Sequence, residues 1–149
     1  MTLDEDAHMT LVRAGWLPGR SVDIDPWITL LRREGIEAHD AARAFLREFG
    51  GLDVAQNRSA PSRARWPFTV DPSACVGEGD RFLEWSAELH RQIVPVGEFD
   101  HGRYFLGLDE ESELYVVELW AATFGRMPVA MNRLVGGVMP IEVTGASGR

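Results

Sequence analysis

The segment YFLGLDEESELYVV, Tyr104 to Val117, is the part of the chain that most clearly determines the fold. Large apolar residues recur at every second position over 104–108 and again over 114–119, which is the period of a β-strand. The residues between them, DEES at 109–112, have the composition of a turn. The sequence therefore predicts an antiparallel hairpin with strands near 103–108 and 113–119 and an acidic tip.

The segments on either side of this hairpin add one strand and two helices. An apolar run over 93–96 is interrupted by Pro95, which predicts an edge strand or the start of a strand. Asp80 is expected to open a helix that carries Phe82, Leu83, Trp85 and Leu89. A closing helix is expected from about Met127 to Val135.

The first half of the chain is predicted to be mainly helical. An amphipathic segment spans 4–13, and Asp25 with Pro26 resembles the N-cap and first residue of a second helix. Apolar residues at helical spacing over 38–49 predict a third helix that stops at Gly50. Residues 52–54 and 66–70 have extended character, and the polar segment 55–65 is expected to be a mobile loop.

Helices first, a meander of strands later and one closing helix predict an α+β fold, without the parallel alternation of βαβ units. The chain has 149 residues, the size of one domain. We expect a single domain over 1–142 and a flexible tail over 143–149. The opening MTLDEDAHMT has no early basic residue, and no run approaches the length of a membrane helix, so a cytoplasmic protein without membrane contact is expected.

The charge pattern predicts a basic protein as the partner. The formal net charge is -8, and all fifteen basic residues are arginine. Residues 98–118 hold seven acidic side chains and one basic side chain, Arg103, a net charge of -6. Nucleic acid is a poor partner for this surface because its phosphates need clustered basic side chains. The sequence carries no signal for an oligomeric state.

Catalytic, metal-binding and cofactor-binding residues are not evident, so we predict a protein that is not an enzyme and holds no cofactor. Cys75 is the single cysteine, and acidic neighbours do not activate a thiol. No two of the four histidines lie within five residues of each other, and no phosphate-binding glycine motif is present. Among the five tryptophans, Trp66 follows an arginine-rich loop, which is a combination common in protein interfaces.

The partner is predicted to bind the acidic stretch around the hairpin, with Trp66 as a further contact. Asp109, Glu110, Glu111 and Glu113 form its firmer half, and Glu98 with Asp100 precedes the same hairpin. These two groups form one patch if the connection folds back toward the tip, and two patches otherwise. The alternative is a plain solvated turn, and either way we expect replacement of residues 109–111 by serine to leave folding nearly unchanged.

The chain resembles the SUKH superfamily, in particular its third group. The resemblance runs through RAGWLPGR (13–20), AFLREFGGL (44–52), FTVDP (68–72), PVGE (95–98) and the hairpin itself, in that order. It implies a sheet backed by helices, and a glycine pair, Gly50 and Gly51, that ends a helix. No catalytic residue carries over from the family.

The resemblance also implies a function as an immunity protein, which binds and inactivates a polymorphic toxin encoded beside it in a bacterial cell. Toxins paired with such proteins are often nucleases or nucleic-acid deaminases. Two alternatives are a protein-interaction module of the same fold that docks onto a cellular protein without any toxin, and a small enzyme. The cognate toxin, its chemistry and the choice between active site and exosite stay open at this stage.

Overall fold

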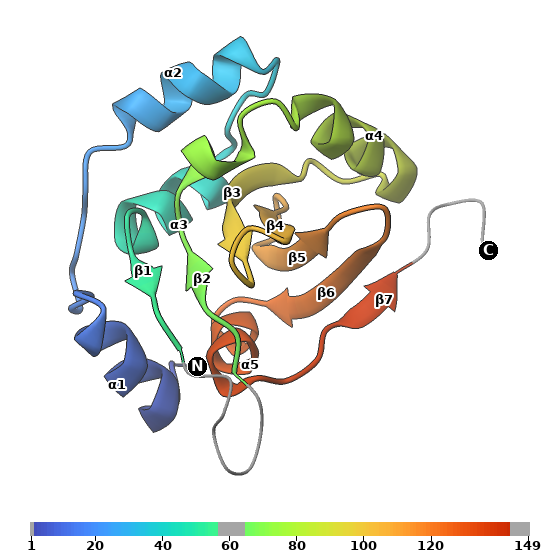
Figure 1. Cartoon of the computed structure of the whole chain (residues 1–149). Helices are drawn as coiled ribbons and strands as arrows, with labels where there is room; N and C mark the ends of the chain where they lie inside the picture. The colour runs from blue at the N-terminus through green and yellow to red at the C-terminus, as the bar shows by residue number, and fades with distance from the viewer. Residues whose placement is uncertain (1, 57–64, 144–149) are drawn as a thin grey trace.

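A computed structural model describes residues 2–56 and 65–143, and its centre is a meander of strands (Figure 1). All neighbouring strands pair antiparallel in chain order, β1-β2-β3-β4-β5-β6-β7. The strands in this part of the chain are β1 (Asp53–Val54), β2 (Phe68–Thr69), β3 (Val94–Phe99), β4 (Tyr104–Leu108), β5 (Glu113–Val117), β6 (Ala121–Arg126) and β7 (Ile141–Val143).

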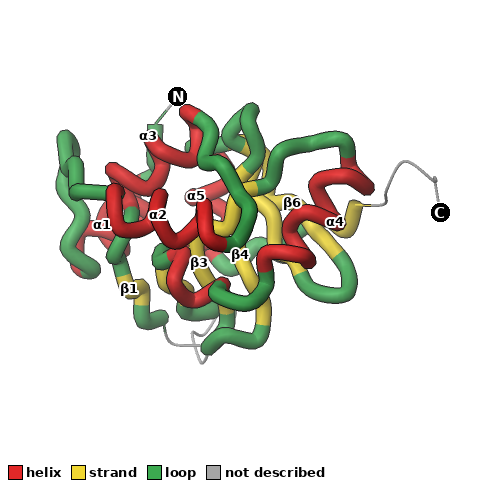
Figure 2. Tube along the Cα trace, turned by 90° about the horizontal axis from the view of Figure 1, so that it is seen from above, coloured by secondary structure: helices red, strands yellow, loops and turns green. Residues whose placement is uncertain are grey.

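Helices pack on this sheet from several sides, which confirms the predicted α+β class with helices backing a sheet. Figure 2 shows α4 on the side of the molecule away from α1, as Figure 1 does. The helices in the described ranges are α1 (Glu5–Arg13), α2 (Asp25–Arg33), α3 (Asp40–Phe49), the short 3-10 helix η1 (Pro72–Cys75), α4 (Gly79–Leu89) and α5 (Val129–Gly136).

The predicted hairpin is formed by β4 and β5, with Phe105 opposite Val117 and Leu108 opposite Leu114. Leu106, Leu108 and Leu114 are buried, as their alternation indicates. The second predicted strand ends earlier than expected, at Val117, and Leu119 lies in the bend after it. The hairpin is therefore confirmed, and its last predicted strand residue belongs to a loop.

Helix α4 packs against this hairpin through an aromatic contact. The ring of Phe82 lies 6.5 Å from that of Phe105, centroid to centroid. Gly107 faces the same helix, and a Cβ at that position would lie 2.5 Å from Ile93 Cγ2 and 2.8 Å from Phe82 Cε1. The close approach of helix and sheet thus requires a glycine in the middle of β4.

Pro95 lies at the second position of β3, which confirms the predicted strand start. The strand is not at the edge of the sheet, because β2 and β4 flank it. The proline is tolerated because β2 pairs only with Glu98 and Phe99, and because the register with β4 shifts between Pro95 and Gly97. Pro95 therefore has no neighbour in β2, and on its other side it lies opposite Gly107 of β4, next to the shift in register.

Helix starts differ by a residue or two from the sequence patterns. Asp25 is the first residue of α2 and Ile24 its N-cap, so the predicted cap lies one position too late. The apolar stripe of α3 begins at Ala38, but the helix starts only at Asp40. His39 provides the N-cap, because its Nδ1 accepts a hydrogen bond from the Ala42 backbone N–H at 3.1 Å.

Two strands near the C-terminal end, β6 and β7, were not predicted. Val143, the first residue of the predicted tail, pairs with Ala121 in β6. The remainder of that tail, and residues 57–64 of the predicted mobile loop, lie outside the described residues.

Candidate protein-binding surface

The hairpin tip, residues 109–113, is built around a buried carboxylate. Asp109 is 0% exposed. Its Oδ1 accepts hydrogen bonds from the backbone N–H groups of Glu111 at 2.8 Å and Glu113 at 3.0 Å, and its Oδ2 accepts one from the Tyr115 hydroxyl at 3.0 Å. The expectation that Asp109 is a solvated turn residue is therefore wrong: its side chain turns inward because it satisfies the backbone of its own turn.

The other carboxylates of the tip also have partners within the chain. Glu111 forms ion pairs with Arg91, at 2.5 Å, and with Arg126. The hydrogen bond from Arg91 and its charge lower the pKa of Glu111. Glu110 accepts a hydrogen bond from the Gln92 backbone N–H at 3.0 Å, and Glu113 accepts one from a threonine hydroxyl of β6 at 2.6 Å. Two arginines thus offset part of the negative charge that the sequence places here.

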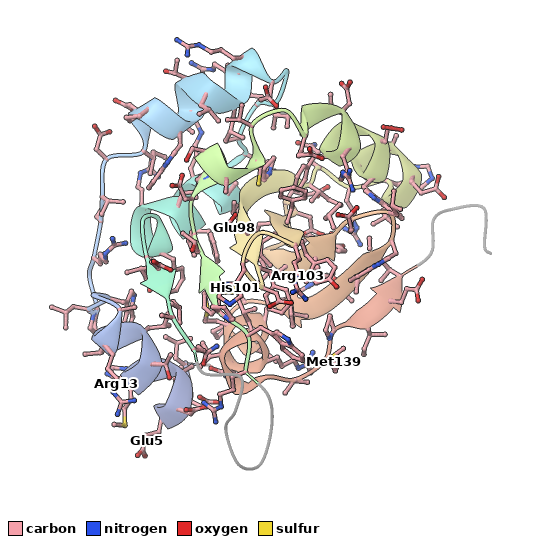
Figure 3. All side chains as sticks on the ribbon, in the orientation of Figure 1. Glu5, Arg13, Glu98, His101, Arg103 and Met139 are labelled. Carbon is pink, nitrogen blue, oxygen red and sulfur yellow. The ribbon has the colours of Figure 1, made fainter. Side chains whose placement is uncertain are left out.

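Glu98 and Asp100 lie at the opposite end of the hairpin ladder. Phe99 pairs with Tyr104 at their end of β4, whereas Leu108 adjoins the tip at the other end. Asp100 is 4% exposed, and its carboxylate lies 3.8 Å from the guanidinium of Arg103. Figure 3 shows Glu98 close to the turn that carries His101 and Arg103. The acidic stretch of the sequence therefore forms two separate groups in the structure.

Trp66 belongs to the end of the sheet that carries Asp100. Its ring lies 5.9 Å from Phe99, and the Asp100 backbone N–H donates to the carbonyl oxygen of the residue after Trp66, at 2.8 Å. Aromatic contacts continue from Phe99 to Tyr104 at 6.2 Å and from Tyr104 to Trp120 at 5.4 Å. Trp66 is thus part of an aromatic row that ends at the half-exposed Trp120, far from the tip.

A groove that the sequence analysis did not identify runs along α4. We call it the α4 groove; it encloses about 600 Å³. Five acidic residues and one basic residue line it, so the charge of its lining is -4. These charged residues are Glu78, Asp80, Glu84, Glu88, Glu118 and Arg81, and Gly77, Trp85 and Leu119 complete the lining.

The charges on the groove's floor are paired with each other. The guanidinium of Arg81 binds Glu78 at 2.8 Å and also binds Glu118, and it lies over the Phe105 ring at 5.8 Å. Burial lowers the pKa of Arg81, but the hydrogen bond and charge of Glu118, together with the charge of Glu78, outweigh burial. The pKa of Arg81 is therefore above its ordinary value. Trp85 donates its indole N–H to the Glu118 carbonyl oxygen at 3.0 Å. The floor is therefore internally paired, with one arginine between two carboxylates and a net charge of -1.

Two kinds of exposed side chain line the groove beside this floor: carboxylates without a partner in the described residues, and an apolar side chain. Asp80, Glu84 and Glu88, which we call the acidic row, are exposed and repeat every four residues along α4. At the groove's end, Leu119 is 87% exposed and Trp120 follows it. The spacing of the acids was visible in the sequence, but only the packing of Phe82 shows that their side of α4 faces away from the core.

The thiol of Cys75 and possible metal ligands are candidate reactive groups in the described part of the chain. Burial raises the pKa of the Cys75 thiol to about 12, and the thiol donates to the Gly97 carbonyl oxygen at 3.2 Å. Within 2–56 and 65–143, no cluster of three His, Cys, Asp or Glu side chains could hold a metal ion. None of the helices in these ranges has the length and apolar character needed to cross a membrane.

The comparisons with known proteins bear on the family of the chain. Comparison with curated proteins found no match, and neither did comparison with solved structures. The family model described as SUKH-3 immunity protein matches residues 3–137, a span that includes α1 and α5 and every strand except β7. This match agrees with the resemblance carried by the sequence motifs, and the chain belongs to the SUKH-3 immunity protein family.

Proposed function

We propose that this protein binds a protein toxin made by the same bacterial cell and neutralises it by direct association. The observation that carries the proposal is the match to the SUKH-3 immunity protein family over residues 3–137. The structure supports inhibition by binding, because exposed charged and apolar side chains gather on one surface while the single thiol is buried and protonated.

The toxin is expected to present a basic surface. The α4 groove carries a charge of -4, and the whole chain carries -8. Proteins that act on nucleic acid need basic surfaces to hold phosphate, so a nuclease or a nucleic-acid deaminase fits an acidic inhibitor. Opposite charges also accelerate association, which matters when a toxin must be captured before it reaches its substrate.

Co-expression tests this function. The product of the neighbouring gene should stop growth when expressed alone and permit growth when this chain is present, and the two purified proteins should form a complex. A neighbouring product that is harmless alone, or that stays toxic and unbound in the presence of this chain, contradicts the proposal. Binding to a harmless cellular protein instead would identify an interaction module of the same fold.

A further inference from the structure

Leu119 is an apolar side chain held rigidly in solvent. Its neighbours are fixed from three directions: the Glu118 N–H donates to the Trp120 carbonyl oxygen at 2.7 Å, Trp85 donates to the Glu118 carbonyl oxygen at 3.0 Å, and the Trp120 ring contacts Tyr104 at 5.4 Å. Leu119 itself is 87% exposed. A large apolar group on a preorganised loop is suited to enter a pocket of a partner, because little conformational freedom is lost on binding.

The acidic row beside Leu119 contributes nothing to the fold through pairing. Across the described part of the chain, Asp80, Glu84 and Glu88 have no ion pair or side-chain hydrogen bond. Acids four residues apart on a helix repel each other, and Glu88 lies at the C-terminal end, where the helix dipole disfavours negative charge. Asp80 lies in the first turn, where the helix dipole favours its charge, so the unfavourable terms fall on Glu84 and Glu88, and a cationic partner would relieve their repulsion.

We infer that the α4 groove, with Leu119 at its end, is the surface on which the toxin docks, and that the toxin meets it with arginine or lysine side chains beside an apolar pocket. The inference rests on the proposed function. A second copy of this chain does not fit the groove, because it carries the same negative charge. The hairpin tip is the weaker candidate, because Asp109 is buried and Arg91 and Arg126 pair with Glu111.

Association kinetics of the full chain with its purified toxin test this assignment. The double variant Glu84→Gln/Glu88→Gln should associate about 10-fold more slowly at low salt, and the difference should shrink as salt is added. Leu119→Ser should dissociate about 10-fold faster, as expected for loss of an apolar anchor. The charge-matched control is Glu5→Gln/Asp40→Asn, on exposed positions of α1 and α3, and it should change either rate by less than about 2-fold.

The outcomes separate the docking surface from the function. If the parent chain neither binds nor neutralises the toxin, the proposed function is wrong. If the parent binds and the groove variants behave like the control, the function stands and the docking surface lies elsewhere. A loss of rate in Glu110→Gln/Glu111→Gln alone would assign docking to the hairpin tip and overturn the inference. Equal thermal unfolding midpoints of all variants and parent, within a few degrees, exclude misfolding as the cause.

Discussion

Replacing Asp109 with serine should destabilise the protein strongly, although sequence reasoning predicts almost no effect. The substitution removes the acceptor of three hydrogen bonds, from the N–H groups of Glu111 and Glu113 and from the hydroxyl of Tyr115. The carboxylate is fully buried, so water cannot replace it without local opening.

The magnitude follows from those three donors. A buried donor that loses its partner costs about 1–3 kcal/mol, and hydrogen bonds to a charged acceptor lie at the upper end of that range. Removal of the buried carboxylate returns part of this energy, because its own desolvation penalty disappears. We expect a loss of about 3 kcal/mol, which for a chain of this size lowers the thermal midpoint by about 6–12 °C.

Urea unfolding followed by tryptophan fluorescence measures the effect, with Glu110→Gln as the matched control at an exposed neighbouring position. The control should stay within about 0.5 kcal/mol of the parent. Tyr115→Phe should cost about 1 kcal/mol alone and much less in the Asp109→Ser background, because both changes remove the same hydrogen bond. A loss below about 1 kcal/mol for Asp109→Ser would refute the internal role assigned to this carboxylate.

Three further predictions follow from the packing and the charges. Glu84→Gln should raise the free energy of unfolding by about 0.4–1 kcal/mol in urea, because it removes two like-charge pairs at i,i+4 spacing, while it slows toxin binding; a stability decrease would contradict this. Gly107→Ala should cost about 2 kcal/mol by overpacking against Phe82 and Ile93, whereas Gly136→Ala, where a Cβ meets no atom within 4 Å, should not destabilise. Cys75 should resist iodoacetamide in the native state at pH 8 and react after unfolding, since its pKa is about 12 when folded. Because the folded pKa is raised, the free energy of unfolding should fall as pH rises above about 8.5, where only the unfolded chain loses the thiol proton.

The sequence predicts the central hairpin and the helices because their patterns are local. Alternation over β4 and β5 and the apolar stripe of α3 each follow from burial of one face, so periodicity is sufficient to find them. Strand β6 escapes this reasoning because Ala121 and Ala122 are small and weakly apolar, and become strand residues only by pairing with β5. Strand β7 has three residues and depends on the return of the chain after α5.

The candidate surface could be predicted only in part, because an acidic residue in the sequence does not show where its carboxylate points. Asp109 and Glu110 are adjacent in a polar turn, yet one is fully buried and the other is exposed. The difference arises from backbone N–H groups that converge on Asp109, which is a property of the turn geometry and not of composition. Trp66 as a partner contact stays a prediction; its half-buried ring packs against the core, and the aromatic row that it joins comes from β3, β4 and the loop before β6.

The acids of this protein therefore separate into two groups with different physical consequences. Carboxylates with partners inside the chain, such as Asp109 with its own turn and Glu118 with Arg81, stabilise the fold, and those paired with arginine contribute little field at a distance. Carboxylates without such partners in the described ranges include the acidic row of α4, whose members face solvent and repel each other. If the toxin presents the basic surface that we propose, its long-range attraction depends on the second group, even though the densest acidic stretch in the sequence belongs mostly to the first. We therefore infer docking at α4 from the location of unpaired charge, and not from the local count of acidic residues.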